Sequence, residues 1–136
     1  MPTTREFTIQ MEDRPGMLGK LCRNLADKGV NILGFQALTN QGKGTIRLVS
    51  DNPNTTKTVL DGQRLTYTET QVAQTRLSHR SGELARVAAR LGEANINIDY
   101  AYVGIEPGTN SPLLICGVAD VARAAKILDE AAAAAA

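Results

Sequence analysis

Two kinds of hydrophobic periodicity follow each other along the chain. Alternating or continuously apolar stretches, typical of half-buried and buried strands, lie at residues 7–11, 30–38, 45–50, 64–70, 72–77, 96–103 and 113–118. Apolar residues spaced three and four apart predict amphipathic helices with the stripes Leu18-Leu21-Cys22-Leu25 and Leu84-Val87-Ala88-Leu91-Ala94. Two further helices are predicted near residues 55–61 and 121–128. The resulting order is strand, helix, strand, strand, helix, strand, and it occurs once in full and a second time without its last strand.

The second half of the chain repeats the first in sequence as well as in pattern. Residues 13–38 align with residues 79–104 without a gap. Six aligned positions are identical, namely Arg14/Arg80, Gly16/Gly82, Leu18/Leu84, Leu25/Leu91, Asn31/Asn97 and Ile32/Ile98. Because an internal repeat defines the unit of folding, we expect two copies of one small unit, with boundaries at residues 1–70 and 71–136.

The predicted fold class is α+β. Each unit is expected to be a ferredoxin-like βαββαβ module, in which two helices cover one face of a four-stranded antiparallel sheet. A unit of this length buries only about 60% of its unfolded surface, so we expect the units to pack together and exposed sheet edges to favour a homodimer. The last strand of the second unit is not evident, because only alanines follow Glu130 and alanine is a poor strand former.

Composition excludes several classes of function. The chain is 43% hydrophobic and 21% charged with a net charge of +1, whereas nucleic-acid and membrane-surface binders normally carry a basic patch. No apolar run approaches the roughly 20 residues of a membrane helix, and the polar N-terminal residues lack a signal-peptide core. We therefore expect a cytoplasmic protein in which Cys22 and Cys116 are reduced thiols, not a disulfide.

The repeated glycine turn and the asparagine after it form the candidate site. A glycine lets the backbone approach another group, and the helix start behind it attracts a carboxylate or phosphate. We expect Asp13 to cap this helix, Pro15 to lie in its first turn and Asn31 to lie beside the turn. The Asn31 amide both donates and accepts hydrogen bonds, so the set suits a zwitterion such as an amino acid. Local chemistry alone favours purely structural roles in a turn for Gly16 and Asn31, and the repetition of both at matched spacing supports the ligand site.

Other charged residues near the turns leave alternatives open. Arg14 and Arg80 are candidates to pair with a ligand carboxylate, although exposed arginines at turns are usually solvated. Asp99, beside Asn97, offers a carboxylate to an ammonium group or simply faces solvent. The single histidine, His79, cannot form a metal site by itself, and no catalytic set or phosphate loop is present. We expect no metal, no cofactor and no catalysis.

Both copies resemble the ACT domain. The first carries the resemblance in Asp13-Arg14-Pro15-Gly16-x-Leu18 and Gly29-Val30-Asn31-Ile32, the second in Arg80-Ser81-Gly82-Glu83-Leu84 and Ile96-Asn97-Ile98. The resemblance covers nearly the whole chain and implies a free-standing tandem-ACT protein that binds an amino acid or another small effector where two modules meet. The ligand contacts that it implies are Asp13, Pro15, Gly16, Met17, Leu18, Asn31 and Ile32, and in the second copy Ser81, Gly82, Glu83, Leu84, Asn97 and Ile98. Since His79 and Ser81 replace the Asp and Pro of the motif, the first copy is the better candidate.

Three hypotheses of function follow. The leading one is a non-catalytic regulatory protein whose assembly, or whose partner enzyme, responds to an amino acid. The second is a dimerising adaptor without a ligand, since some modules of this family serve only for assembly. The third is an acylphosphatase-like enzyme, for which Arg14 and Asn31 are the required residue types, although the glycine-rich loop of that family is not visible.

Overall fold

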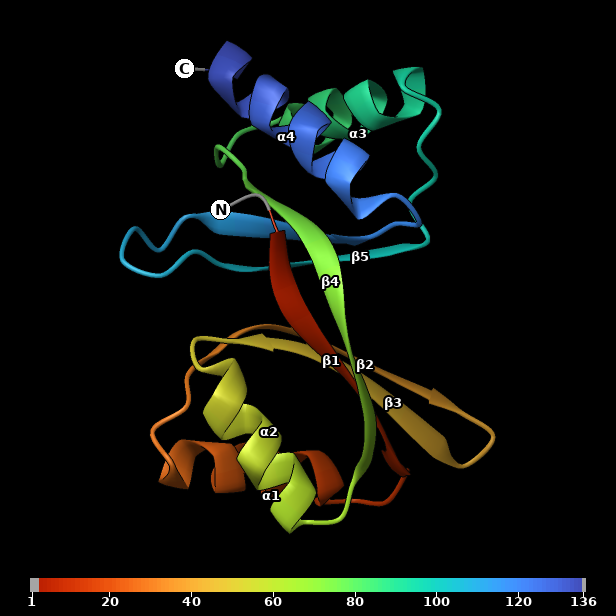
Figure 1. The fold of residues 1–136 in the computed structure, drawn as a ribbon, viewed down its shortest axis with the longest axis vertical. Helices are drawn as coiled ribbons and strands as arrows, with labels where there is room; N and C mark the ends of the chain where they lie inside the picture. Colours follow the sequence, from red (N-terminus) through yellow and green to blue (C-terminus); the bar gives the residue numbers. More distant parts are fainter. Residues whose placement is uncertain (1–2, 136) are drawn as a thin grey trace. The chain divides into compact units, whose positions relative to one another are not determined.

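The computed structural model describes residues 3–135 and has the α+β class that the sequence predicts. Within these residues one antiparallel sheet has six strands in the order β2-β3-β1-β4-β6-β5, and four helices accompany it (Figure 1). The elements are β1 (Thr3–Glu12), α1 (Met17–Asp27), β2 (Ile32–Asn40), β3 (Lys43–Ser50), α2 (Pro53–Gly62), β4 (Thr66–Arg76), α3 (Glu83–Glu93), β5 (Tyr100–Ile105), β6 (Pro112–Gly117) and α4 (Val121–Ala135).

The chain divides into two compact units. One, the N-terminal unit, is Arg5–Thr70; the other, the C-terminal unit, contains Thr3 and Thr4 together with the chain from Gln71 onward. The two strands predicted at residues 64–70 and 72–77 form the single strand β4, so the division falls inside a strand. Thr3 and Thr4, the first described residues of β1, thus belong to the C-terminal unit, and β1 is the neighbour of β4 in the sheet.

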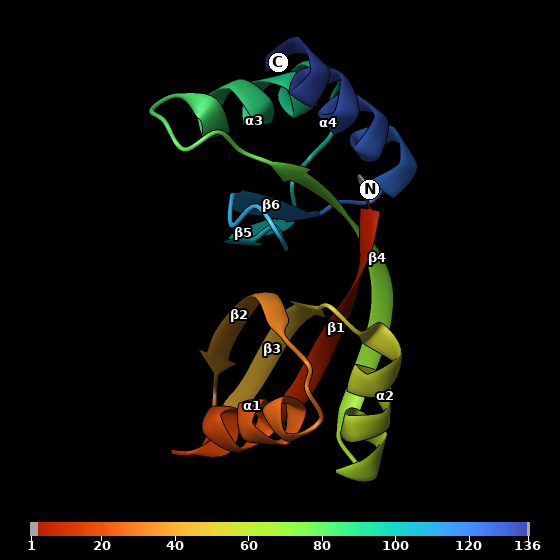
Figure 2. The same cartoon turned by 90° about the vertical axis from the view of Figure 1, so that its left-hand side faces the viewer.

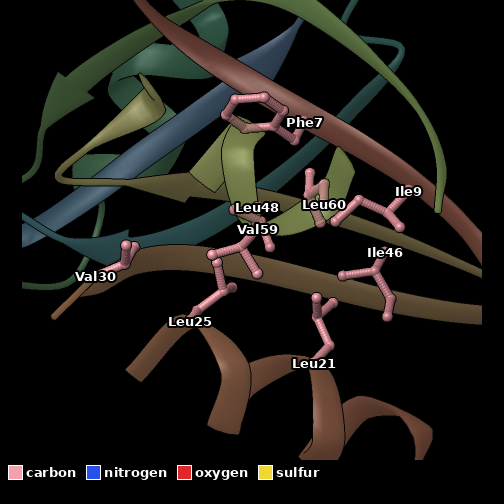
Figure 3. Close-up of a cluster of buried hydrophobic side chains, with 9 residues drawn as sticks. All are labelled: Phe7, Ile9, Leu21, Leu25, Val30, Ile46, Leu48, Val59 and Leu60. Atoms are coloured by element: carbon pink, nitrogen blue, oxygen red, sulfur yellow. The ribbon is translucent and has the colours of Figure 1, made fainter. Parts of the chain in front are cut away.

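The N-terminal unit has a four-stranded sheet with α1 and α2 on one face (Figures 1 and 2). Phe7 of β1 lies opposite Leu48 of β3, and Ile9 lies opposite Ile46. Since paired residues point to the same face of a sheet, these side chains meet the helices together. Figure 3 shows the resulting core, which consists of Phe7, Ile9, Leu21, Leu25, Val30, Ile46, Leu48, Val59 and Leu60.

The C-terminal unit pairs β4 with β6 and β6 with β5, and α3 and α4 cover one face (Figure 1). Its core consists of Ala73, Leu77, Val87, Leu91, Ile96, Leu114, Cys116, Ala124 and Leu128. The strand predicted from residue 96 begins only at Tyr100. Ala101 and Val103 lie opposite the core residues Cys116 and Leu114, so they face the helices and the alternating tyrosines do not.

Side chains cap the starts of two helices, and both cysteines are free. Asn52 caps α2 by accepting a hydrogen bond from the Thr55 amide (3.1 Å), and the Asp120 carboxylate accepts one from the Arg123 amide (3.1 Å). The alanines from 131 to 135 continue α4, in keeping with their high helix propensity; Ala136 lies outside the described residues. Cys22 and Cys116 are free thiols, and burial raises the pKa of Cys22 and raises that of Cys116 to about 11.

Among the residues that the structure describes, no helix has both the length and the apolar character needed to cross a membrane.

Candidate functional site

Gly16 and Gly82 precede α1 and α3 in the same left-handed conformation. Their φ angles are 87° and 88°, and ψ is −9° at both. The helices begin at Met17 and Glu83 without a side-chain cap, so the predicted cap by Asp13 and the predicted place of Pro15 in the first helical turn are wrong. A Cβ atom on either glycine would meet nothing within 4 Å. The backbone angle therefore requires glycine, and the space in front of each turn is open.

The backbone hydrogen bonds of the two turns correspond one to one. In the first turn the amides of Arg14, Met17 and Lys20 donate to the carbonyls of Glu12 (3.2 Å), Arg14 (3.2 Å) and Gly16 (3.0 Å). In the second turn the amides of Arg80, Glu83 and Arg86 donate to Ser78 (2.9 Å), Arg80 (3.4 Å) and Gly82 (2.9 Å). Within residues 3–135 the amides of Leu18 and Gly19 have no acceptor. The start of α1 thus offers two unpaired donors.

Charged side chains surround the first turn. Arg14 Nε lies 2.8 Å from Glu12 Oε2, and Arg14 Nη2 donates to Met17 Sδ at 3.6 Å. The Asp13 amide donates to the Gly42 carbonyl (3.1 Å), which ties the turn to the β2–β3 hairpin. Its carboxylate has no partner among the described residues. The turn therefore presents a free carboxylate close to free amide donors, an arrangement that is complementary to a zwitterion.

A hollow of about 160 Å³ opens beside the first turn, inside the N-terminal unit. The ends of β1 and β2 meet there because both strands pair with β3, where Lys43 lies opposite Glu12 and also opposite Asn40. Most of its surface is apolar. Its lining residues are Met11, Glu12, Asp13, Arg14, Met17, Leu18, Ala37, Leu38, Thr39, Gly44 and Ile46. Four of the residues predicted for the site are therefore brought together, and Pro15 and Gly16 lie in the same turn.

Asn31 and Ile32 lie at the opposite end of the unit. Ile32 is opposite Ser50, the last residue of β3, whereas the turn adjoins Lys43, the first. The 11 residues of α1 separate the two ends, a distance of about 16 Å along the helix. In Figure 3, Val30 accordingly lies near Leu25, away from Ile46. The expectation that Asn31 lies beside the turn of its own copy is wrong.

Asp51 holds the backbone of Asn31 and leaves its side chain free. The Asn31 amide donates to Asp51 Oδ1 (2.9 Å), and the Asn31 carbonyl accepts from the Asp51 amide (3.0 Å). The exposed side-chain amide has no hydrogen bond within the described part of the chain. The backbone of Asn31 is thus held by Asp51, and the donor and acceptor of its side-chain amide are exposed to solvent.

The second turn is electrostatically different because Glu83 stands where the first copy has Met17. The Glu83 side chain is 6% exposed and accepts from Arg86 Nε (3.3 Å), Arg86 Nη2 (3.2 Å) and Arg80 Nη2 (3.1 Å). The hydrogen bonds from Arg86, with help from Arg80, lower the pKa of Glu83 although desolvation raises it. Arg86 Nη1 also donates to the Ala131 carbonyl (2.9 Å) and so links α3 to α4. A negative charge already occupies this helix start.

The other predicted residues of the second copy are dispersed. Asn97 Nδ2 donates to Asp99 Oδ1 at 3.1 Å, so this asparagine has a partner that Asn31 lacks. Ser81 and Leu84 are exposed, and Ile98 packs against the core. Met11, Ala37 and Ile46 line the hollow but were not predicted as site residues, because only strand register places them beside the turn.

Solved structures share this fold. Protein BT0572 from Bacteroides thetaiotaomicron superposes with a TM-score of 0.83 at 19% identity, over 95% of this chain and 88% of that one. The regulatory subunit of aspartate kinase from Thermus thermophilus gives a TM-score of 0.63 at 11% identity, over 96% and 93%. Aspartate kinase from Clostridium acetobutylicum gives 0.57 at 13% identity, over 95% of this chain and 33% of the enzyme.

These identities are low, so the comparisons establish a common ACT-like, ferredoxin-type architecture. No protein-family model matches the sequence, and a search of curated proteins found no significant match.

Proposed function

We propose that the chain is a tandem-ACT protein, with modules at residues 1–70 and 71–136, that binds an amino acid and regulates without catalysis. The observation that carries the proposal is the first turn, where the amides of Leu18 and Gly19 are unpaired and Asp13, whose carboxylate has no partner among the described residues, lines an apolar hollow together with Leu18. These groups match the ammonium, the carboxylate and the side chain of an amino acid. The regulatory subunit of aspartate kinase, which has a similar fold, supports a regulatory role.

The N-terminal copy is the stronger ligand site. Glu83 already places a buried carboxylate at the start of α3 and is paired there with Arg80 and Arg86, so a ligand carboxylate would have to take its place. Asn97 is bonded to Asp99. The corresponding residues of the first copy are Met17 and Asn31. They leave the start of α1 and the asparagine side-chain amide available to a ligand. We propose that Ser81, Gly82, Glu83, Leu84, Asn97 and Ile98 form a weaker or vacant counterpart.

A complete site of the kind implied by the resemblance requires a second module. Since Asn31 and Ile32 lie at the far end of α1 from the turn, one module cannot bring the turn and these two residues to the same ligand. We propose a homodimer in which Asn31 and Ile32 of one copy approach the turn of another. β2 is a terminal strand of the sheet and carries Phe35 at 50% exposure. An exposed sheet edge of this kind is suited to pairing with a second chain.

A thermal-shift screen of the proteinogenic amino acids tests the function. A ligand at 100 times its Kd stabilises the folded protein by about 2.7 kcal/mol, which is readily detected. Gly16→Asp places a carboxylate before the free amides and should abolish the shift, whereas Gly82→Asp, the matched change in the second copy, should retain it. Sedimentation with and without the active amino acid then reports on assembly. The absence of any shift at millimolar concentrations would contradict the proposal.

The exposed edge of β2 also favours the alternative, a dimerising adaptor without a ligand. That function predicts an unchanged dimer in Gly16→Asp and no response to any amino acid. An acylphosphatase-like activity is disfavoured, because Arg14 and Asn31 lie at opposite ends of the unit and cannot act on one phosphate there. We expect no hydrolysis of a simple acyl phosphate.

A further inference from the structure

We infer that the hollow beside the first turn holds the side chain of the bound amino acid and selects an aliphatic or thioether side chain of leucine or methionine size. This inference rests on the proposed function and adds to it the class of ligand. It concerns a hollow in the N-terminal unit, whose lining adds residues of β1, β2 and β3 to the motif residues Asp13, Arg14 and Leu18.

The volume of the hollow limits its occupant. It measures about 160 Å³, whereas pockets for drug-sized ligands occupy about 300–1,000 Å³. An apolar cavity of about 150 Å³ accommodates benzene. The hollow beside the turn therefore has room for one medium-sized side chain, and a nucleotide or a sugar phosphate is too large for it.

The lining separates polar from apolar groups. Its acidic and basic residues, Glu12, Asp13 and Arg14, are consecutive in the turn, and Glu12 and Arg14 form an ion pair with each other. The remaining walls are mainly apolar and include the two flexible thioethers of Met11 and Met17, which adapt to ligands of irregular shape. A charged ligand side chain placed against these walls would lose its hydration without gaining a partner.

The turn then orients the ligand. The ammonium group approaches the free carboxylate of Asp13, and the ligand carboxylate approaches the amides of Leu18 and Gly19. Because the turn forms the polar side of the hollow, a ligand held in this way directs its side chain toward Ala37 and Ile46. The contacts at the turn recognise the ammonium and carboxylate groups that amino acids share, and the hollow distinguishes one amino-acid side chain from another.

Ala37 determines how much room the side chain finds. It lies opposite Ile46 on the helix side of the sheet, and its single methyl group leaves the hollow open. The C-terminal unit has the larger Val103 at this place, opposite Leu114, and has Glu83 in place of Met17. Because valine is larger than alanine and Glu83 is a buried carboxylate, we expect the selectivity only in the N-terminal copy.

Calorimetric titration of the full chain tests the inference with L-leucine, L-methionine, L-alanine, L-lysine and L-aspartate. One methylene in an apolar pocket changes discrimination by about 10–200-fold, so leucine and methionine should bind at least about tenfold more tightly than alanine. Ala37→Leu should weaken leucine and methionine by about tenfold or more and change alanine little. Val103→Leu is the matched control and should behave as the unmodified chain. Ala37→Val, which copies the residue of the second unit, replaces Ala37→Leu if the latter does not fold.

The outcomes separate this inference from the proposed function. Tight binding of leucine or methionine that is lost in Ala37→Leu supports both. Amino-acid binding that favours lysine, aspartate or alanine, or that Ala37→Leu leaves unchanged, overturns the inference and keeps the regulatory function. Failure of every proteinogenic amino acid to bind overturns both. If none binds and Ala37→Leu dissociates a dimer seen by sedimentation, the hollow receives a side chain of a second copy, and the inference is wrong.

Discussion

Gly16 and Gly82 adopt the same left-handed conformation at equivalent places in two copies, with φ of 87° and 88° and ψ of −9° at both. The residues around them differ, since Pro15 precedes one and Ser81 precedes the other. Equal geometry with unequal neighbours indicates that the β-strand-to-helix turn itself imposes the backbone angle. The contribution of either glycine to the stability of the fold can therefore be predicted without reference to a ligand.

We predict that Gly16→Ala and Gly82→Ala each destabilise the protein by about 1–2 kcal/mol, the cost of the left-handed conformation for a residue with a Cβ atom. No steric term adds to it, because a Cβ atom at either site meets nothing within 4 Å. Urea denaturation followed by circular dichroism measures the change. The control is Gly19→Ala in α1, which also has open space and should stabilise by about 0.5–1 kcal/mol. Equal effects at positions 16 and 19 would contradict the prediction.

The Glu83 cluster predicts a pH dependence. Hydrogen bonds from Arg86 and Arg80 lower the pKa of Glu83 in the folded protein, so its ionised form stabilises the fold at pH values above the unfolded value of about 4.3. That stabilisation is lost as the pH falls through the lower folded pKa. Glu83→Gln should reduce the free energy of unfolding at pH 7 and have a smaller effect at pH 3.

The matched control for this titration is Glu93→Gln. Glu93 is an exposed residue of the same helix and forms no ion pair within the described residues. Because it has no ion pair to lose, the control should reduce the free energy of unfolding at pH 7 by less than Glu83→Gln does. A Glu83→Gln effect of the same size at both pH values would show that the carboxylate charge is not involved.

The Tyr67 phenol should lose its proton at a higher pH than an ordinary tyrosine. Its hydroxyl donates to Asp61 Oδ1 at 2.6 Å, and this hydrogen bond is the main cause that raises the pKa of Tyr67 to about 12. The stabilisation of the fold by the neutral phenol is complete below pH 10 and is lost as the pH rises toward 12. Ultraviolet absorption titration of the unmodified chain and of Asp61→Asn measures it. The variant should move one of the three tyrosines to lower pH, and coincident curves would refute the assignment.

The two cores should respond alike to the loss of equivalent leucines. Leu25 in α1 and Leu91 in α3 are both 0% exposed, and replacement of a fully buried leucine by alanine costs about 2–5 kcal/mol. We predict a loss in this range for Leu25→Ala and for Leu91→Ala, measured by chemical denaturation. Leu84, which is 52% exposed, provides the control, and Leu84→Ala should change stability by less than about 0.5 kcal/mol. A large effect of Leu84→Ala in dilute solution would reveal an interface that covers it.

Local patterns predicted those parts of the fold that depend on near neighbours. The stripes that contain Leu25 and Leu91 predicted α1 and α3, and the left-handed Gly29 (φ 74°) follows the end of α1. Asn52 and Asp120 cap the helices that follow them. In each case the deciding interaction joins residues at most a few positions apart, so the sequence contains the information directly.

The limits of the second unit and the composition of the site did not follow from such patterns. Strand β4 is continuous from Thr66 to Arg76, although the sequence pattern predicted two short strands there. Glu83 was predicted as a ligand contact, but two arginines bind it. Both outcomes depend on pairing between segments that are distant in sequence, and a periodic pattern does not contain that pairing.

The sequence by itself determined the repeat, the order of helices and strands, and the need for glycine at positions 16 and 82, since these follow from local backbone sterics and side-chain periodicity. Only the tertiary structure decided that Asn31 lies at the far end of α1 from the turn and that Ala37 and Met11 adjoin it. The physical reason is register. Hydrogen bonding of β1 and β2 to β3 fixes which strand ends meet, and those bonds join residues as far apart as Phe7 and Leu48.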